Sequence, residues 1–246
     1  MTTTERTRIE TAAATREGST APSGDATALF VLADETVGAA LVDGIGHSDR
    51  VARTAGLLAE VAARTAARRG VLAGLLGAGE LIADPGAGDE PEPDAVAAVA
   101  VTAPGDSTTR VAWVGDARAY GWDGERLTLY STDQTMGQWV RQHNEVPAEI
   151  AAHHDAWVRV SLSTAVVATV REVEIPDPVV ILTSDGVHDS VDHQTLEELV
   201  GRVLRAYGHN PGALAEALVG AARRVRGGDR DDATALVLIH QGPGDR

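Results

Sequence analysis

The sequence predicts an α+β fold in which strands and helices are grouped rather than regularly alternated. Along the chain, the expected elements are strands, helices, strands, helices and one final strand, which favours layered sheets and helices over repeated βαβ units. Hydrophobic residues form 43% of the 246 residues and aromatic residues only 3%, so Ala, Val and Leu must build the core. No shift in composition marks a second domain.

Charge and composition exclude several classes of function. The chain has 36 acidic and 21 basic residues, a formal net charge of −15, and no Cys. Without Cys there is no disulfide framework, no Cys-ligated metal cluster and no thiol nucleophile. The acid excess argues against a nucleic-acid partner and against an anionic membrane, since both require clustered positive charge. Neither a signal peptide nor an apolar run near the roughly 20 residues of a membrane span is recognisable, so we expect a cytoplasmic protein.

The first part of the chain is expected to contain a tail, a hairpin and two helices. Residues 1–22 are rich in Thr, Ala, Ser, Gly and Pro without an apolar period, which predicts a poorly ordered tail before a domain spanning residues 23–242. Ser48 or Asp49 can cap the first helix. Strands are expected at 28–33 and 37–42, helices at 48–69 and 71–83, and an acidic, Pro-rich loop at 84–94.

The second part of the chain changes period and then returns to helices. Asp123 and Gly124 form a hairpin signal between two of its strands, and a Pro opens the last helix. The expected strands are 95–102, 109–114, 117–122, 126–130, 166–175, 179–183 and 233–240, and the expected helices are 134–144, 147–153, 196–207 and 211–226.

Acidic residues recur at the ends of these strands. An isolated Asp-Gly pair usually marks a turn, but Asp43 and Asp185 each terminate a run of buried-type residues and so would be held on a rigid element. Asp116 follows a strand, Asp231 precedes the last strand, and Asp25 precedes the first.

Carboxylates gathered at one end of a sheet repel one another, so they need a cation or their pKa values rise. Mg²⁺ and Mn²⁺ suit carboxylate, carbonyl and water ligands. Gly44, directly after Asp43, would let the backbone carbonyl approach a metal without obstruction by a side chain. The sequence therefore predicts a hard-metal site.

The motifs around these acids, taken together and in order, resemble those of the metal-dependent type 2C protein Ser/Thr phosphatases, the PPM family. Asp43 begins a match to the motif Asp-Gly-x-Gly, and Asp116 lies in a match to Gly-Asp-Ser-Arg-x-Tyr. The matching stretches cover roughly residues 23–240 and are Ser23–Asp25, Val42–His47, Gly115–Tyr120, Thr132–Thr135, Leu182–Asp189 and Asp231–Thr234.

The resemblance implies an α-β-β-α sandwich, in which two antiparallel sheets are flanked by helices and the metals lie at one end. It also implies two Mn²⁺ or Mg²⁺ ions, with a third position in bacterial members. Asp43 would bridge the two ions and Gly44 would supply a carbonyl, while Asp185 and Asp231 complete the pair. Asp116 with Asp185 would form the third position.

The implied reaction is hydrolysis of phosphoserine and phosphothreonine in a phosphorylated protein by a metal-activated water. Asp25 would hydrogen-bond a metal-coordinated water. His47 is a candidate proton donor for the leaving alkoxide; a surface His at a helix start is the alternative interpretation.

The sequence departs from the family pattern where substrate phosphate is held. The family has an Arg five residues before the position of Asp25, and here that residue is Thr20. Arg16 is the nearest upstream Arg and would need a loop rearrangement to hold the phosphate in place of the missing Arg. The alternative interpretation is that Arg16 is a solvated side chain in the tail. The family's Asn-Glu-Asp element is Ser23-Gly24-Asp25, which lacks one carboxylate.

Three functions are therefore compatible with the sequence. The first is a protein Ser/Thr phosphatase. The second is a catalytically weak or inactive phosphatase-like domain that binds a phosphoprotein or a regulatory partner. The third is a small-molecule phosphomonoesterase, which the same metal centre would allow.

Overall fold

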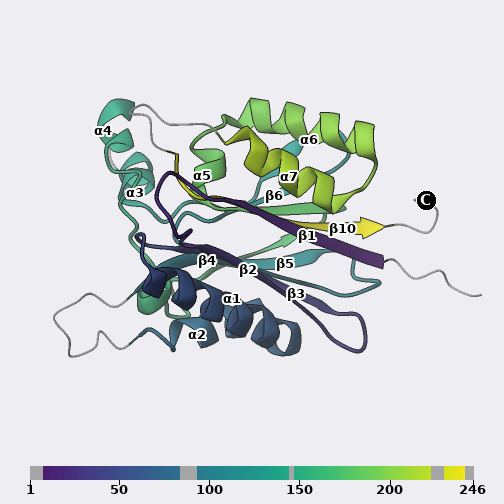
Figure 1. Ribbon diagram of the computed structural model, residues 1–246, viewed down its shortest axis with the longest axis horizontal. Coiled ribbons are helices and arrows are strands. Elements are labelled where there is room, and N and C mark those ends of the chain that lie inside the picture. The colour runs from purple at the N-terminus through teal and green to yellow at the C-terminus, as the bar shows by residue number, and fades with distance from the viewer. Residues whose placement is uncertain (1–7, 84–92, 144–146, 223–229, 242–246) are drawn as a thin grey trace, which may run out of the picture.

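The structure is a computed structural model that describes residues 8–83, 93–143, 147–222 and 230–241 (Figure 1). Nearly all of the loop predicted at 84–94 and the end of the helix predicted at 211–226 lie outside the described residues. The prediction of a tail can be tested only from residue 8 onward.

Two antiparallel five-stranded sheets form the centre of the molecule. The first sheet has the order β1-β10-β9-β6-β7 and the second has the order β2-β3-β4-β5-β8. In the first sheet, the strands are β1 (Arg8–Arg16), β10 (Ala233–Gln241), β9 (Val179–Thr183), β6 (Arg118–Trp122) and β7 (Leu127–Leu129). In the second sheet, they are β2 (Asp25–Val31), β3 (Val37–Gly44), β4 (Ala95–Thr102), β5 (Thr109–Val114) and β8 (Arg171–Ile175).

Helices cover the outer face of each sheet (Figure 1). The second sheet is covered by α1 (Asp49–Arg69) and α2 (Val71–Gly79), and the first by α6 (His193–Tyr207) and α7 (Pro211–Ala221). The shorter helices are α3 (Met136–His143), α4 (Ala148–Ala152), α5 (Asp185–His188) and the 3₁₀ turn η1 (Leu162–Thr164). The predicted α-β-β-α sandwich of an α+β fold is therefore confirmed.

The central strands are buried on both faces, so they are apolar at consecutive positions. In β3, Ala39 and Leu41 pack between the two sheets, whereas Ala40 and Val42 pack under α1 and α2. Successive side chains of a strand point to opposite faces, which produces this division. Small Ala side chains at these positions let the layers approach closely despite the scarcity of aromatic residues.

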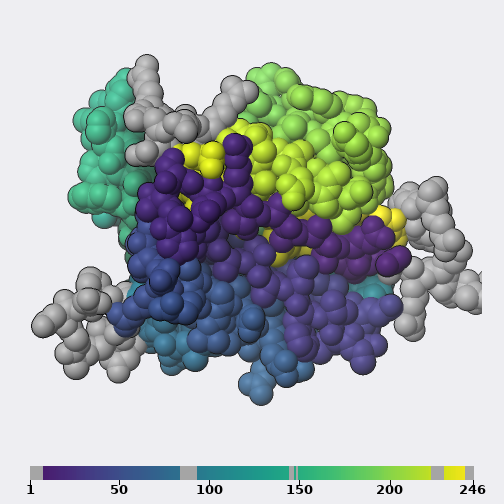
Figure 2. Space-filling model, in the orientation of Figure 1, coloured from purple at the N-terminus to yellow at the C-terminus, as the bar shows by residue number. Residues whose placement is uncertain are grey.

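The largest difference from the sequence prediction is β1, because residues 8–16 were predicted to be part of a poorly ordered tail. This prediction was wrong: the strand pairs with β10 along its whole length, from Arg8 opposite Gln241 to Arg16 opposite Ala233. β1 is an edge strand whose Thr- and Ala-rich sequence has a single large apolar residue, Ile9, and therefore shows no clear alternation. Figure 2 shows this purple segment at the surface, between the blue α1 layer and the green α6–α7 layer.

Smaller differences have local causes. The strand predicted at 166–175 begins only at Arg171, because the Thr169 hydroxyl exchanges hydrogen bonds with the backbone of Val166 and closes a turn. Helix α6 begins at His193, three residues before the predicted start, because the Asp192 side chain caps it by accepting from the Thr195 backbone N–H. Within the described segments, no helix is both long and apolar enough to cross a membrane.

Candidate functional site

Four strands bring acidic residues to one end of the sandwich. Because β3 and β5 are both antiparallel to β4, they end on the same side, which places Asp43 near Asp116. Likewise, β9 ends beside the start of its antiparallel neighbour β10, which places Asp185 near Asp231. These residues surround a cavity of about 350 Å³, lined by Asp43, Gly44, Ile45, Gly46, His47, Val96, Asp116, Ala156, Val158, Asp185, Asp231 and Asp232.

Six of the seven site residues proposed from the sequence therefore line one cavity. The seventh, Asp25, lies directly behind it, since it is the register partner of Asp43 across β2 and β3. Ser184, the residue before Asp185, donates a hydrogen bond of 2.7 Å from its hydroxyl to Asp25 Oδ2. The Ser184 oxygen in turn accepts one of 2.9 Å from the Thr234 backbone N–H. Asp25 is thus held between both sheets.

The two acids at the centre of the cavity are electrostatically strained in the absence of a cation. Burial raises the pKa of Asp43 well above its ordinary value, and the charges of Asp25, Asp185, Asp116 and Asp231 raise it further. Burial also raises the pKa of Asp185, with the charge of Asp231 as the next contribution. Both effects disfavour the carboxylate form, so a bound cation would relieve an existing cost.

The surrounding acids share this strain. Burial raises the pKa of Asp25 to about 6, although the hydrogen bonds from Ser184 and Thr234 oppose the shift. Burial likewise raises the pKa of Asp116 to about 6, with further contributions from Asp133 and Asp189.

Asp232 has a structural role that the sequence did not reveal. Its Oδ1 accepts a hydrogen bond of 2.6 Å from the Gly18 backbone N–H, and its Oδ2 accepts one of 2.7 Å from the Gly24 N–H. The side chain is only 4% exposed. It therefore fastens the segment leading into Asp25 to the start of β10. The sequence offered no signal for this role beyond the adjacent Asp231.

Two glycines allow the acid-bearing segments to approach closely. A Cβ on Gly186, directly after Asp185, would lie 1.9 Å from the backbone oxygen of Asp232. A Cβ on Gly44 would lie 2.5 Å from a Val51 methyl group and 2.8 Å from the Gly24 oxygen. These distances are too short for any side chain, so packing requires a glycine after each of these two Asp residues.

No Arg among the described residues lines this cavity. Thr20 is exposed and does not line it. Arg16 lies on β1 and donates hydrogen bonds of 3.2 Å to the carbonyl groups of Gly220 and Ala222 at the end of α7, so it does not replace the missing Arg. His47 does line the cavity, and its Nδ1 lies 3.9 Å from Asp232 Oδ2.

The donor set suits a hard divalent ion, although it does not form a closed cage. Five carboxylates line the cavity, yet within the described residues no group of three or more His, Asp or Glu side chains is arranged to hold one metal ion. Mg²⁺ typically keeps several waters and takes only one or two carboxylates, and Mn²⁺ favours the same ligand types. An ion that keeps several waters and takes one or two carboxylates is compatible with the five carboxylates that line this cavity.

Comparison with known proteins places the fold. No family model matches the sequence, and no curated protein matches it. Solved structures match over nearly the whole chain. The S. agalactiae serine/threonine phosphatase is 15% identical, with a TM-score of 0.76 and coverage of 95% of this chain and 100% of that chain.

Two further matching structures are of the phosphatase PstP, and one of them contains manganese. The Mycobacterium tuberculosis serine/threonine phosphatase PstP/Ppp is 22% identical, with a TM-score of 0.65 and coverage of 95% and 99% of the two chains. The catalytic domain of PstP in complex with 2 manganese ions is 23% identical, with a TM-score of 0.66 and coverage of 96% and 100%. At these identities the likeness establishes the fold: this chain has the fold of the bacterial PPM-type Ser/Thr phosphatases.

Proposed function

We propose that this chain is a metal-dependent protein Ser/Thr phosphatase of the bacterial PPM type. The observation that carries the proposal is the cavity lined by five carboxylates, at the end of a sandwich that shares its fold with such phosphatases. The motifs that carry the sequence resemblance contribute the cavity's acids, from Asp43 on β3 to Asp231 before β10.

The ions would be held by the acids at the strand ends. Asp43, the carbonyl of Gly44, Asp185 and Asp231 would bind two Mn²⁺ or Mg²⁺ ions, and Asp116 would join Asp185 at a third position. The PstP catalytic domain, which has the same fold, is in complex with 2 manganese ions, which supports divalent-ion binding by this chain. Bound there, divalent ions would supply Lewis-acid activation of a water and would offset charge on the phosphoryl oxygens.

The chain's own residues would orient the reactants and supply protons. Asp25, held by Ser184 beside Asp43, would accept a hydrogen bond from the attacking water and fix its direction. His47 lies on the cavity wall with 40% of its side chain exposed. From that position it would donate a proton to the leaving Ser or Thr alkoxide. Val96, Ala156 and Val158 form an apolar part of the cavity wall.

The alternative is a catalytically weak relative that binds a phosphoprotein, and one observation favours it. A guanidinium can grip phosphate through two hydrogen bonds, and among the residues that the structure describes no Arg lines this cavity. Placing an Arg at Thr20 tests the point, since Thr20→Arg would restore the charge at the family's position. If the missing Arg limits catalysis, the variant lowers KM for p-nitrophenyl phosphate, whereas the control Thr128→Arg on β7 does not.

A substrate panel tests the proposed function. Hydrolysis of p-nitrophenyl phosphate and of a phosphothreonine peptide is measured with Mn²⁺ and with chelator. A protein phosphatase hydrolyses both substrates and loses both activities with chelator. Hydrolysis of the small ester alone would favour the phosphomonoesterase, and no metal-dependent turnover on either substrate would favour the non-catalytic binding domain.

A further inference from the structure

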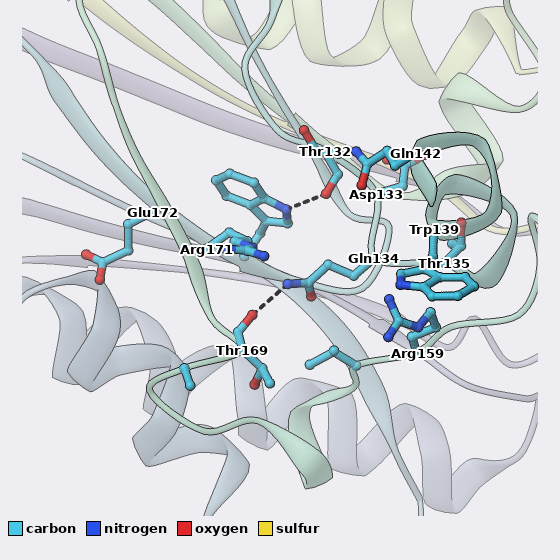
Figure 3. Close-up of a pocket in the computed structure, with 13 residues that line it drawn as sticks. Thr132, Asp133, Gln134, Thr135, Trp139, Gln142, Arg159, Thr169, Arg171 and Glu172 are labelled. Carbon is cyan, nitrogen blue, oxygen red and sulfur yellow. Dashed lines mark hydrogen bonds between the residues drawn. The ribbon is translucent and has the colours of Figure 1, made fainter. Parts of the chain in front are cut away.

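A second cavity, of about 410 Å³, lies beside α3 and is separate from the carboxylate cavity (Figure 3). Its walls come from the end of β5, the start of β8, α3 and the connecting segments around residues 132–135 and 159–169. Trp113 and Trp139 provide aromatic surfaces, and Arg159 and Arg171 provide positive charge. Nothing in the proposed reaction uses these four residues.

The walls of this cavity are fixed by hydrogen bonds rather than by loose contacts. The Trp113 indole N–H donates to the Thr132 carbonyl at 3.0 Å. The Gln134 amide crosses the cavity to donate to the Thr169 carbonyl at 2.6 Å, as Figure 3 shows. A preformed shape of this kind lowers the ordering cost of binding a ligand.

Within the described part of the chain, no acidic side chain neutralises the positive charge in the cavity. Arg159 lies over the Trp139 ring, 5.4 Å from its centroid, and Arg171 reaches toward the cavity (Figure 3). With the described residues, neither guanidinium forms a hydrogen bond or an ion pair. In a chain with a net charge of −15, two such groups in one cavity favour an anionic ligand.

The two acids on the cavity wall do not cancel this charge. Asp133 is bound by both Nε and Nη2 of Arg118, at 2.9 and 2.6 Å, so its carboxylate is already paired. Glu172 points away from the other labelled side chains in Figure 3. The cavity therefore presents free guanidinium groups and little free carboxylate.

The second cavity adjoins the carboxylate cavity through one short segment. Val158 lines the carboxylate cavity, and its neighbour Arg159 lines the second one. Gln134 also connects them, because its side-chain oxygen accepts a hydrogen bond of 2.9 Å from the backbone N–H of Gly115, the residue before Asp116. The two cavities therefore share a segment of wall, and an extended peptide, which spans about 3.5 Å per residue, can follow that segment from one cavity to the other.

We propose that this second cavity binds acidic side chains of the phosphoprotein substrate, a few residues from the phosphorylated residue. The proposal rests on the proposed phosphatase function and adds a substrate class to it. Arg159 and Arg171 lie on either side of Gln134 (Figure 3), so each guanidinium can meet a different carboxylate of one peptide chain. Each guanidinium can form charge-assisted hydrogen bonds with a carboxylate, and Trp139 supports the apolar part of the acidic side chain.

The test compares two fluorescent phosphothreonine peptides that differ only in Glu or Gln at the positions flanking the phosphorylated residue. Binding is measured by fluorescence anisotropy, which requires no turnover. We expect the wild-type protein to prefer the Glu peptide and Arg159→Gln or Arg171→Gln each to reduce that preference by roughly fivefold. The control Arg202→Gln, at an exposed position on α6, should retain the preference.

The outcomes separate this proposal from the proposed function. Equal binding of the two peptides by the wild-type protein, or an unchanged preference in the double variant of Arg159 and Arg171, would overturn the acidic-substrate proposal. If inorganic phosphate perturbs Trp fluorescence in an Arg159-dependent manner while the two peptides bind equally, the cavity is a small-anion site and the proposal is wrong. Hydrolysis of p-nitrophenyl phosphate, which lacks flanking residues, reports on the proposed function alone and should be unchanged in Arg159→Gln.

Discussion

Asp25 and Asp43 are direct partners across the antiparallel strands β2 and β3, so two half-buried carboxyl groups occupy adjacent positions at the end of one sheet. Burial raises the pKa of both groups; the charge of Asp25 raises the pKa of Asp43 further, whereas a side-chain hydrogen bond with Asp43 lowers the pKa of Asp25 in part. Such a pair is unfavourable in a protein without a bound cation, because one charge destabilises the other. The pairing therefore links the fold of this end of the molecule to ion binding.

The stability of the metal-free protein should depend on pH through Asp25. Its pKa is raised from 3.8 to about 6 in the folded state, so the stability associated with its protonated form is present below about pH 4 and is lost as the pH rises through 6. Between pH 4 and pH 7, the wild type should lose about 3 kcal/mol of unfolding free energy through this group. Asp25→Asn cannot titrate and should not show this loss. Urea unfolding in chelator measures the difference, and parallel pH profiles for the two proteins would contradict the assignment.

Mn²⁺ should stabilise the folded protein through the same carboxylates. An ion that binds only the folded state adds about 2.7 kcal/mol at a concentration one hundred times its Kd, so the wild-type Tm should rise with Mn²⁺ and fall back with chelator. Asp43→Asn should be at least as stable as wild type without metal but should lose most of the Mn²⁺-dependent rise. Glu198→Gln, on the surface of α6, serves as the control and should show the full rise; an equal rise in Asp43→Asn would place the ions elsewhere.

Asp232 should be a determinant of stability through its two backbone hydrogen bonds. Asp232→Ala leaves the N–H groups of Gly18 and Gly24 without their acceptors and should cost about 3 kcal/mol. Asp232→Asn keeps one acceptor oxygen and should cost roughly half as much. Chemical denaturation gives both values, and hydrogen exchange at Gly18 and Gly24 should accelerate in the Ala variant; unchanged exchange there would show that Asp232 does not hold the segment.

Gly186 should tolerate no side chain, in contrast with Gly56 on α1. A Cβ at Gly186 would lie 1.9 Å from the Asp232 oxygen, whereas nothing lies within 4 Å of a Cβ at Gly56. Gly186→Ala should destabilise the protein by more than about 2 kcal/mol, and Gly56→Ala should stabilise it by about 0.5–1 kcal/mol because Ala favours helix. Thermal unfolding compares the two variants, and similar Tm values would mean that the α5 contact is not tightly packed.

Much of the layered fold followed from sequence pattern because its central strands are buried on both sides. The apolar runs that became β3, β4 and β9 are visible without any alternation. β1 was missed because an edge strand of Thr and Ala carries too little hydrophobic signal, and its pairing with β10 joins residues more than 200 positions apart. Local propensity cannot show such a contact.

The candidate site was predictable to the extent that its acids lie next to the ends of strands. Asp43, Asp116, Asp185 and Asp231 stand at strand ends, so the antiparallel order of the sheets brings them together. The role of Asp232 was not predictable, because its partners are backbone N–H groups of a segment without a pattern of its own. The arginines of the second cavity, Arg159 and Arg171, lie outside every motif and meet only in the folded chain.

The most direct measurement is the rate of phosphate release from a phosphothreonine peptide at saturating Mn²⁺, for wild type and for Asp185→Asn. Circular dichroism first establishes that both proteins are folded. If the carboxylate cavity is the catalytic metal site, wild type releases phosphate only with Mn²⁺ and Asp185→Asn is slower by about 100-fold or more. Equal rates for the two folded proteins, or a wild-type rate that chelator does not reduce, would contradict this account.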